Sequence, residues 1–433
     1  MNNDFESEIP PIILPEESFE GDYIIASYFY IAKSDEDVYE KAKSFAIGQT
    51  IGTWVPVPGI TPEMKKKYGG RVVSIYDIPP VELTSDLPEE TYHIIQIAFP
   101  DDNFLPQIPM LMTTLLGNDV STSAQVKLID IKFSKKFLNA FKGPKFGING
   151  IYEYMGINAQ QKRPIVLNMI KPCLGFSAKE GASIFKQIAM GGVDIIKDDE
   201  LFADTSYSSI KERVKLYTKA AKEVYEKTGH LTRYCVNITD RFDKVIEHAK
   251  IAQEEGADFL MINFVATGIS ILQILSEMQD ISIPIVAHYA TAGSMTESPY
   301  TGISTPLLLG KLARMAGADM CMFSSPYSTY PFLKRRYKQI ADMQRLPFGN
   351  LKPTMPIIGG GVHPNSAQKI VKDLGKEIVL ASGGAILGHP LGPTEGAKSM
   401  MQAVEILAKG LSLEEVANQK GYEALKISIE KWV

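Results

Sequence analysis

The sequence predicts two domains, a small N-terminal α+β domain followed by a C-terminal (β/α)₈ barrel. Two observations support this prediction. The chain has 433 residues, too many for one ordinary domain. Beyond residue 163, continuous apolar segments alternate eight times with amphipathic segments of helical length. Eight such units are typical of a closed parallel sheet surrounded by helices.

The first 140 residues predict an arm and the smaller domain. Residues 1–20 are rich in Pro and Glu and form the predicted arm. In residues 21–140, mixed strands and helices fit a ferredoxin-like α+β domain. Turn-forming residues make 139–156 a predicted connection. The predicted helix covers residues 35–49, and the predicted strands cover residues 22–32, 71–78, 92–100 and 124–133.

Residues 141–433 form the predicted barrel domain. A doubly wound open sheet is the alternative, but its GxGxxG fingerprint after a first strand is absent. The predicted strands are 163–171, 193–200, 231–239, 257–265, 283–290, 318–324, 355–361 and 377–384. The predicted helices are 177–192, 208–229, 241–256, 270–279, 304–317, 332–344, 365–375 and 394–410.

Composition points to a cytoplasmic protein with no nucleic-acid or membrane partner. The net charge is −5, with acidic and basic residues nearly balanced. The three cysteines are far apart and form no CxxC pair, which argues against a disulfide framework and a zinc finger. No segment reaches transmembrane length, and the acidic start lacks the pattern of a signal peptide.

The strand ends supply the candidate catalytic residues, because barrel enzymes place their chemistry at the C-terminal ends of the strands. Lys171 and His288 occupy two of these ends, and Lys197 with Asp199 and Glu200 occupies a third. The acids have two interpretations. They are either a helix N-cap or oxygen ligands for Mg²⁺. In the second case, Lys197 can add CO₂ and become a carbamate, which would be a third anionic ligand.

Two glycine clusters follow the seventh and eighth predicted strands, at Gly359–Gly361 and Gly383–Gly384. Barrel enzymes often bind a phosphate at this position, because bare backbone N–H groups can approach the oxygens closely. The alternative is a pair of tight turns that need positive φ. The joint position of the clusters favours the phosphate site.

Six motifs resemble the large subunit of ribulose-bisphosphate carboxylase (RuBisCO). The segment "GGVDIIKDDE" at 191–200 is similar to the family's metal-site signature. The others occur in the family's order: "IGTW" at 51, "GPKFGI" at 143, "IKPCLG" at 170, "GGGVHP" at 359 and "LGHPLGPTEGA" at 387. The resemblance covers nearly the whole chain. It implies the two predicted domains and a homodimer in which both subunits build each active site.

The resemblance also implies roles for individual residues. Lys197 would be the carbamylated ligand of Mg²⁺, beside Asp199 and Glu200. Lys171 would move protons at the substrate carbon, and His288 would contact substrate hydroxyls. As a base, Lys171 would need a pKa well below its usual value of about 10.4. The residues implied for one phosphate are Thr53, Trp54, Gly361, Gly383 and Gly384.

Departures from the carboxylase pattern predict a protein without carboxylase activity. Cys173 stands where carboxylases have a second lysine, and the loop at 322–332 lacks their lysine. Gly48 and Met110 replace a glutamate and an asparagine. The Arg, His and Ser of the second phosphate site are replaced by Tyr289, Met322 and Gly359. Because a buried phosphate needs charge-assisted donors, we expect a substrate with one phosphate.

These departures resemble the RuBisCO-like proteins, and three enzyme branches stay open. The first is 2,3-diketo-5-methylthiopentyl-1-phosphate enolase, but Asn118 occupies the place of that enzyme's lysine base. The second is an isomerase of 5-methylthioribulose-1-phosphate, and the third acts on a phosphorylated oxo-sugar acid. The sequence favours the last two, with enolisation or proton transfer as the shared chemistry. A non-catalytic regulatory scaffold is the other alternative, although intact buried charges argue against it.

Overall fold

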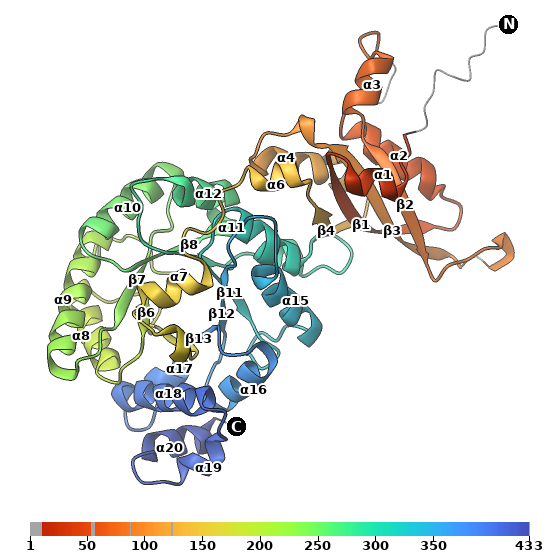
Figure 1. Cartoon of the computed structure of the whole chain (residues 1–433). Helices are drawn as coiled ribbons and strands as arrows, with labels where there is room; N and C mark the ends of the chain where they lie inside the picture. Colours follow the sequence, from red (N-terminus) through yellow and green to blue (C-terminus); the bar gives the residue numbers. More distant parts are fainter. Residues whose placement is uncertain (1–10, 53–56, 87, 123, 433) are drawn as a thin grey trace, which may run out of the picture. The chain divides into compact units, whose positions relative to one another are not determined.

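A computed structural model describes residues 11–52, 57–86, 88–122 and 124–432. The chain divides into two compact units. The first contains Met1–Phe141 and Ala292–Leu308, and the second contains Lys142–Thr291 and Leu309–Val433. Each unit has its own sheet (Figure 1).

The first unit contains a five-stranded sheet in the order β10-β4-β1-β3-β2. The pairs β1–β3, β1–β4 and β2–β3 are antiparallel, whereas β10 runs parallel to β4. The first four strands, with helices between β1 and β2 and between β3 and β4, follow the order βαββαβ, which confirms the predicted ferredoxin-like α+β domain. The strands are β1 (Tyr23–Lys33), β2 (Arg71–Ile78), β3 (Glu90–Pro100), β4 (Val126–Lys132) and β10 (Gly302–Ile303).

One face of this sheet is buried by helices because apolar residues alternate along β1. Ile24, Ala26 and Tyr28 are fully buried, and the Tyr28 hydroxyl donates to the carbonyl of Leu115 at the end of helix α4. The helices are α1 (Pro15–Glu20), α2 (Val38–Gly48), α3 (Pro62–Tyr68), α4 (Ile108–Leu115), α5 (Asn118–Ser121) and α6 (Lys135–Asn139). Short 3₁₀ turns cover Thr84–Asp86 and Asp101–Asn103.

The segment Ala292–Leu308 comes from the middle of the barrel sequence but belongs to the first unit. It contains α13 (Gly293–Thr296) and β10, whose residues pair with Lys127 and Leu128 of β4. The Ser304 hydroxyl donates to the carbonyl of Ile129. Sequence analysis missed this exchange because a two-residue strand has no detectable hydrophobic period.

The second unit is a closed eight-stranded parallel barrel in the order β11-β12-β13-β5-β6-β7-β8-β9. All eight predicted strands are present, so the barrel prediction is confirmed. Their residues are almost all buried, which explains why they are continuous apolar runs. They are β5 (Ile165–Met169), β6 (Ile195–Lys197), β7 (Arg233–Asn237), β8 (Phe259–Asn263), β9 (Ile285–His288), β11 (Met320–Ser324), β12 (Met355–Gly359) and β13 (Val379–Ala381).

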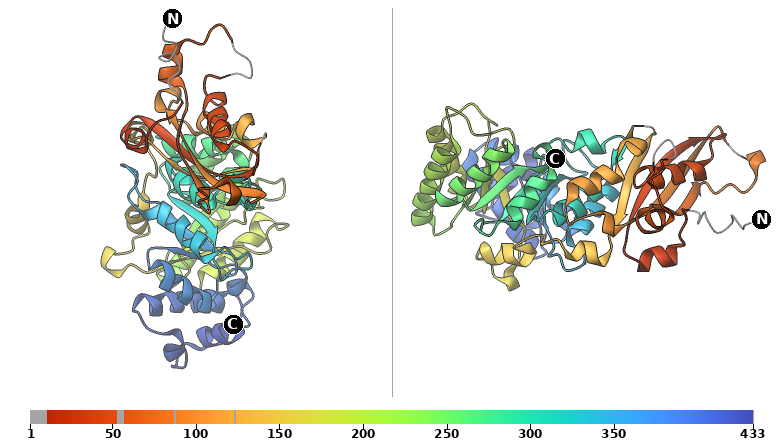
Figure 2. Two further views of the ribbon diagram at one scale, coloured as in Figure 1. Left: turned by 90° about the vertical axis from the view of Figure 1, so that its right-hand side faces the viewer. Right: turned by 90° about the horizontal axis from the view of Figure 1, so that it is seen from above.

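Helices surround the barrel (Figure 2), and side chains cap the start of some of them. Ser177 and Glu180 form a capping box on α8, and Ser209 caps α9. The acids after Lys197 therefore do not cap α9. The surrounding helices are α8 (Ala178–Ala189), α9 (Ile210–Thr228), α10 (Phe242–Glu254), α11 (Phe264–Thr267), α12 (Ile269–Glu277), α14 (Ala313–Met315), α15 (Lys334–Arg345), α16 (Pro364–Leu374), α17 (Gly384–Leu387) and α18 (Pro393–Ala408). A π-helical turn, Leu307–Leu312, precedes α14.

The predicted connection at 139–156 is wrong in part, because it contains helix α7 (Gly147–Tyr154). Ile148, Ile151 and Tyr152 of α7 pack into the same apolar cluster as the inward side chains of the barrel strands. A 3₁₀ turn, Ala159–Gln161, links it to β5. Gly147 begins this helix, Gly150 lies within it and Gly156 follows it, so residues typical of turns concealed a short helix.

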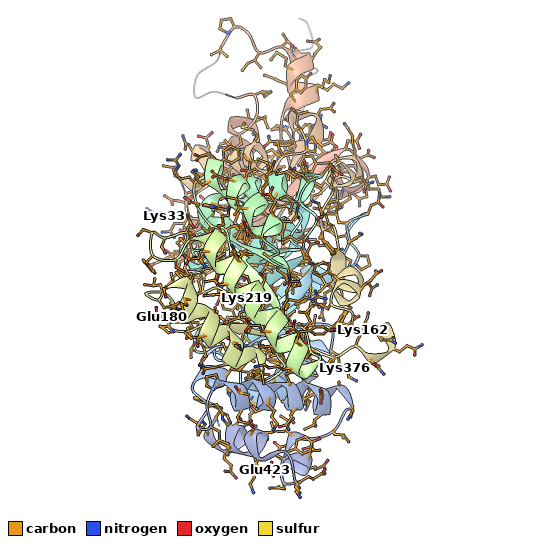
Figure 3. All side chains as sticks on the ribbon, turned by 90° about the vertical axis from the view of Figure 1, so that its left-hand side faces the viewer. Lys33, Lys162, Glu180, Lys219, Lys376 and Glu423 are labelled. Carbon is orange, nitrogen blue, oxygen red and sulfur yellow. The ribbon has the colours of Figure 1, made fainter. Side chains whose placement is uncertain are left out.

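The chain ends in α19 (Leu413–Ala417) and α20 (Glu423–Lys431), which contact α18. Figure 3 shows Lys219 on α9 and Glu180 on α8 among the many side chains of the outer helix layer. Among the described residues, no helix is long and apolar enough to cross a membrane.

Candidate functional site

The predicted catalytic residues lie at one end of the barrel. Lys197 is the last residue of β6, and His288 is the last residue of β9. Lys171 follows β5 by two residues, and Asp199 and Glu200 follow β6. Since all eight strands are parallel, these positions share the C-terminal mouth, as expected for a barrel enzyme.

Direct contacts join these side chains into two groups, and the charge of Lys171 also acts on Glu200, so the groups form one cluster. Lys171 Nζ lies 2.5 Å from Asp199 Oδ2. Lys197 Nζ lies 3.4 Å from Glu200 Oε2, and His288 Nε2 lies 3.5 Å from the same oxygen. Lys197 is completely buried, whereas 38% of the Lys171 side chain is exposed. The cluster therefore has a buried floor at Lys197 and an accessible side at Lys171.

The surroundings shift the pKa of Lys171 and the pKa of His288 in opposite directions. Burial lowers the pKa of Lys171, but hydrogen bonds to Asp199 and Cys173 and the charge of Asp199 outweigh it and raise that pKa overall. This is the opposite of the shift expected for a lysine base. Burial and the Lys197 charge lower the pKa of His288 well below its usual value. His288 is consequently a neutral imidazole at pH 7.

The Glu200 carboxylate is ionised and its backbone is fixed. Burial raises its pKa, but the positive charge of Lys197 and other favourable contacts leave the pKa below its usual value. Asn263 Nδ2 donates to the Glu200 carbonyl over 2.9 Å, and Asn237 Nδ2 donates to it over 3.2 Å. Two amides from neighbouring strands therefore hold the turn that presents Asp199 and Glu200.

Asp198 has a different role from its neighbours. Its carboxylate is completely buried and accepts from Tyr234 OH at 2.7 Å and from Arg213 Nη2 at 3.3 Å. The backbone N–H of Asn237 donates to it as well. Sequence analysis missed Arg213 and Tyr234, because neither stands at a strand end and only alternation along β7 hinted that Tyr234 faces away from the barrel axis.

The sulfur atom of Cys173 lies 3.1 Å from Lys171 Nζ. The thiol is partly exposed at the mouth, whereas Cys235 and Cys321 are buried in the barrel wall. Only Pro172 separates Lys171 from Cys173 in the sequence, so this contact could be expected from the sequence. The pair stands where carboxylases have two lysines.

The two glycine clusters also lie at the mouth, and a hydrogen bond links the loops that carry them. The Ser382 hydroxyl, next to Gly383, donates to the carbonyl of Val362, next to Gly361, over 2.7 Å. A Cβ atom on Gly383 would come within 2.6 Å of Met169 Sδ, which places this loop against the end of β5. A Cβ atom on Gly384 would meet nothing within 4 Å. The glycine loops therefore form an open cradle beside the strand that leads to Lys171.

Positive φ explains part of the glycine pattern. Gly360 and Gly361 have φ of +83° and +76°, which disfavours other residues. Gly383 and Gly384 have no positive φ, so a tight turn does not account for them. Thr53 and Trp54, the other predicted phosphate ligands, lie outside the described residues.

Tyr289, Met322 and Gly359, predicted to replace a second phosphate site, also lie together. A Cβ atom on Gly359 would stand 2.1 Å from Met322 Cε. The Met322 side chain therefore fits here because residue 359 has no side chain. Tyr289 packs against the apolar cluster that contains Met322. Burial raises the pKa of Tyr289, although a hydrogen bond with Ser324 acts in the opposite direction. This side of the mouth is neutral and partly apolar.

Two of the other histidines have structural contacts. His389 accepts from the N–H of Leu391 and contacts the carbonyl of Ala424. His248 pairs with Asp240 at 3.0 Å on the wall of a cavity of about 220 Å³ between α9 and α10. The cavity's three acids already have partners: Asp240 pairs with His248, Glu247 pairs with Lys244, and Asp204 accepts from the N–H of Ile210. It is separate from the cluster at the mouth.

The comparisons with known proteins agree with this geometry. Residues 147–325 and 336–432 match the family "Ribulose bisphosphate carboxylase large chain, catalytic domain", and residues 16–137 match the N-terminal domain of the same chain. A "Ribulose bisphosphate carboxylase-like protein" of Archaeoglobus fulgidus is 39% identical over 422 residues, covering 96% of this chain and 95% of that protein.

One further relative is named for an enolase, and one solved structure is that of a RuBisCO-like protein. The 2,3-diketo-5-methylthiopentyl-1-phosphate enolase of Bacillus cytotoxicus is 36% identical and covers 93% of this chain and 97% of its own. The crystal structure of a RuBisCO-like protein, MtnW, from Alicyclobacillus acidocaldarius matches with a TM-score of 0.86 and 31% identity. That match covers 95% of this chain and 100% of the solved one. This chain therefore belongs to the ribulose-bisphosphate carboxylase large-chain family and groups with its RuBisCO-like proteins.

Proposed function

We propose that this protein is a Mg²⁺-dependent enzyme whose substrate is a singly phosphorylated keto sugar or oxo-sugar acid. It enolises the substrate's carbonyl group or moves a proton at the carbon beside that carbonyl. One observation carries the proposal. The cluster of Lys197, Asp199 and Glu200 contacts the partly exposed Lys171, and the strand before Lys171 borders the glycine cradle. Charge-stabilising and proton-moving groups thus share one mouth with a phosphate cradle.

The side chains fit a Mg²⁺ site only if Lys197 is modified. In the described part of the chain, no group of three His, Cys, Asp or Glu side chains can hold a metal. A third anion must then come from Lys197, whose neutral amine would add CO₂, lose one proton and become a carbamate. A Mg²⁺ ion held by this carbamate, Asp199 and Glu200 would polarise a substrate carbonyl.

Charge balance supports this modification. Lys171 and Lys197 carry two positive charges, and Asp199 and Glu200 carry two negative charges. After carbamate formation and binding of one Mg²⁺, the charges of the same groups again sum to zero. Both states therefore avoid an uncompensated charge in a largely buried cluster, which would cost several kcal/mol.

Each residue at the mouth has a proposed task. Lys171 carries the proton to or from the substrate carbon, because it is the exposed basic group of the cluster; to act as a base it has to give up the contact with Asp199 that raises its pKa. Neutral His288 binds a substrate hydroxyl, since one ring nitrogen can donate while the other accepts. Gly361, Gly383 and Gly384 bind the phosphate, with Thr53 and Trp54 of a second subunit. The neutral surface at Tyr289 and Met322 receives the unphosphorylated end.

A screen in heavy water tests this function. Phosphorylated ketoses and oxo-sugar acids are incubated with the protein, Mg²⁺ and bicarbonate, and deuterium at the carbon beside the carbonyl is followed by NMR. We expect exchange with at least one compound, and no exchange with Lys197→Ala. Exchange that is unchanged in Lys197→Ala would contradict the proposal. With ribulose bisphosphate and labelled bicarbonate, we expect no acid-stable product above the same control.

The enolase of methionine salvage is the second candidate. Its support is the name shared by several relatives that are 34–36% identical over 93–94% of this chain. Asn118, an exposed residue at the start of α5, argues against it, since an amide cannot replace a lysine base. Consumption of 2,3-diketo-5-methylthiopentyl-1-phosphate by the wild type, lost in Lys197→Ala, would establish this candidate instead.

A regulatory scaffold is the non-catalytic alternative. A scaffold has no need of the Lys–Asp–Glu cluster, so it predicts no effect of Mg²⁺ and bicarbonate on the melting temperature.

We propose further that the protein is a cytoplasmic homodimer with shared active sites, on the basis of the family resemblance. Light scattering during size-exclusion chromatography would show a mass near twice 47.8 kDa. A monomer mass at micromolar concentration would contradict the dimer.

A further inference from the structure

The loop at residues 325–333, after β11, lies on the glycine loop that follows β12. A Cβ atom on Gly360 would stand 2.6 Å from Ser328 Oγ. A Cβ atom on Gly361 would stand 3.4 Å from Thr329 Cγ2 and 3.5 Å from the Thr329 backbone nitrogen. Ser328 and Thr329 are therefore immediate neighbours of the proposed phosphate cradle.

Ser328 and Thr329 differ in whether their polar groups already make hydrogen bonds. Ser328 Oγ is engaged, since it lies 2.6 Å from Ser324 Oγ and accepts from the N–H of Tyr330. Thr329 is exposed, and within the described parts of the chain neither its N–H nor its hydroxyl makes a hydrogen bond. The free N–H of Thr329 thus lies beside Gly361, its free hydroxyl belongs to the same residue, and Ser328 fixes the turn that carries both.

A hydrogen bond outside the cradle holds this loop in place. Tyr327 OH donates to Asp373 Oδ2 on α16 over 2.8 Å, and Lys334 Nζ donates to the same hydroxyl over 3.1 Å. Lys334 also pairs with Asp373 at 3.0 Å. Helix α16 begins three residues after Gly361, so one helix anchors both the loop and the glycine turn.

We propose that Thr329 binds the substrate phosphate through its N–H and hydroxyl, and that Tyr327 is a positioning residue that keeps Thr329 there. The inference rests on the proposed phosphate site, to which it adds donors from a third loop beside the two glycine loops. The ligand class is a phosphate monoester, or any tetrahedral oxyanion of that size. On this loop, neutral donors then stand where the carboxylases that the sequence resembles have a lysine.

Binding of inorganic phosphate to the full chain, measured by calorimetry, tests this proposal. Thr329→Val removes the hydroxyl at nearly constant volume, and we expect it to weaken phosphate binding about tenfold, because a hydrogen bond to a charged group is lost. Thr329→Ser restores a hydroxyl and should bind within about twofold of the wild type. Equal affinity in Thr329→Val and wild type would overturn the assignment.

The positioning role of Tyr327 has its own test. Tyr327→Phe should weaken phosphate binding, and the double variant Tyr327→Phe/Thr329→Val should bind no more weakly than Thr329→Val alone. Additive losses would show that Tyr327 does not act through Thr329. Tyr330→Phe is the matched control, since 75% of Tyr330 is exposed and its hydroxyl makes no hydrogen bond within the described residues. It should bind phosphate as the wild type does.

Gly384→Asp separates failure of this inference from failure of the phosphate site itself. The new carboxylate would occupy the open space beside the cradle and repel an anion. Loss of phosphate binding in Gly384→Asp with full binding in Thr329→Val would leave the site in place and reject Thr329. Full binding in both variants would reject the site as well.

Discussion

Asp198 shows how one residue can support a reactive cluster without belonging to it. It lies between Lys197 and Asp199 in sequence, but its carboxylate contacts Arg213 and Tyr234 on the other side of the strand. Lys197 Nζ in turn donates to the Asp198 carbonyl over 2.9 Å. The buried ion pair therefore fixes the backbone from which the proposed metal ligands project.

Asp198→Asn is expected to weaken the fold and the metal site together. The change leaves the buried Arg213 guanidinium without its counterion, and we expect the free energy of unfolding to fall by about 3 kcal/mol. Mg²⁺ binding in bicarbonate should weaken as well. Denaturant unfolding and a Mg²⁺ titration measure the two effects. Asp243→Asn, which breaks an exposed pair with Arg241, should change stability by less than about 1 kcal/mol.

A double variant separates stability from positioning. Asp198→Asn combined with Arg213→Met removes both charges, so much of the stability should return. Mg²⁺ binding should not return, because the fixed carboxylate is still missing. Recovery of both properties would show that Asp198 serves the fold alone.

At the residue scale, the sequence was informative where residues stand at strand ends. Lys171, Lys197, Asp199, Glu200 and His288 were all predicted from that rule, and the structure brings them together. The roles of Arg213 and Tyr234 were not predictable, because their partner lies 15 and 36 positions away. The neighbours of Thr329 were hidden for the same reason, since the contact joins two loops.

At the element scale, Arg314 organises the chain between α15 and β12. Its guanidinium is buried and has no carboxylate partner within the described residues; burial lowers its pKa to about 10. Instead it donates to the carbonyls of Leu346, Leu351 and Lys352 at 2.6, 2.7 and 2.8 Å. One side chain therefore satisfies the backbone of a segment that has no secondary structure of its own.

Arg314→Met should destabilise the protein by about 3 kcal/mol or more. The apolar side chain fills the volume but leaves at least three carbonyls unpaired, each costing about 1–3 kcal/mol if it remains buried. Denaturant unfolding measures the loss, and Arg335→Met, at an exposed position of α15, is the control. A loss equal to that of Arg335→Met would show that water replaces the guanidinium.

Element prediction succeeded where the hydrophobic period was long and failed where it was short. The eight barrel strands and the helices between them were predicted because burial makes their apolar pattern continuous. Helix α7 was missed because its glycines resemble a loop, although Ile151 and Tyr152 are deeply buried. Strand β10 was missed because its pairing with β4 depends on residues about 175 positions away.

For the molecule as a whole, Asp319 makes stability depend on pH. It is buried at the start of β11 and accepts from the N–H groups of Phe146 and Ile285. Burial raises its pKa from 3.8 to about 6, despite these hydrogen bonds. Between pH 4 and pH 6 the folded protein therefore holds a proton that the unfolded chain has released. This contribution to stability is present at low pH and is lost as the pH rises through 6.

Comparison with Asp319→Asn isolates this contribution. A shift of two pKa units corresponds to about 3 kcal/mol. Between pH 4 and pH 7, the unfolding free energy of the wild type should fall by about that amount relative to the variant. Urea unfolding at each pH measures the difference, and Asp35→Asn, on an exposed turn, should follow the wild type. Parallel pH profiles for wild type and Asp319→Asn would contradict the raised pKa.

The central claim is that Lys197, as a carbamate, completes a Mg²⁺ site with Asp199 and Glu200. The most direct measurement is carbon-13 NMR of the protein with Mg²⁺ and labelled bicarbonate, together with calorimetric Mg²⁺ titration. We predict one carbamate signal per chain and Mg²⁺ binding that needs bicarbonate, with both absent in Lys197→Ala. A carbamate signal that persists in Lys197→Ala, or Mg²⁺ binding of unchanged affinity in that variant, would contradict the account.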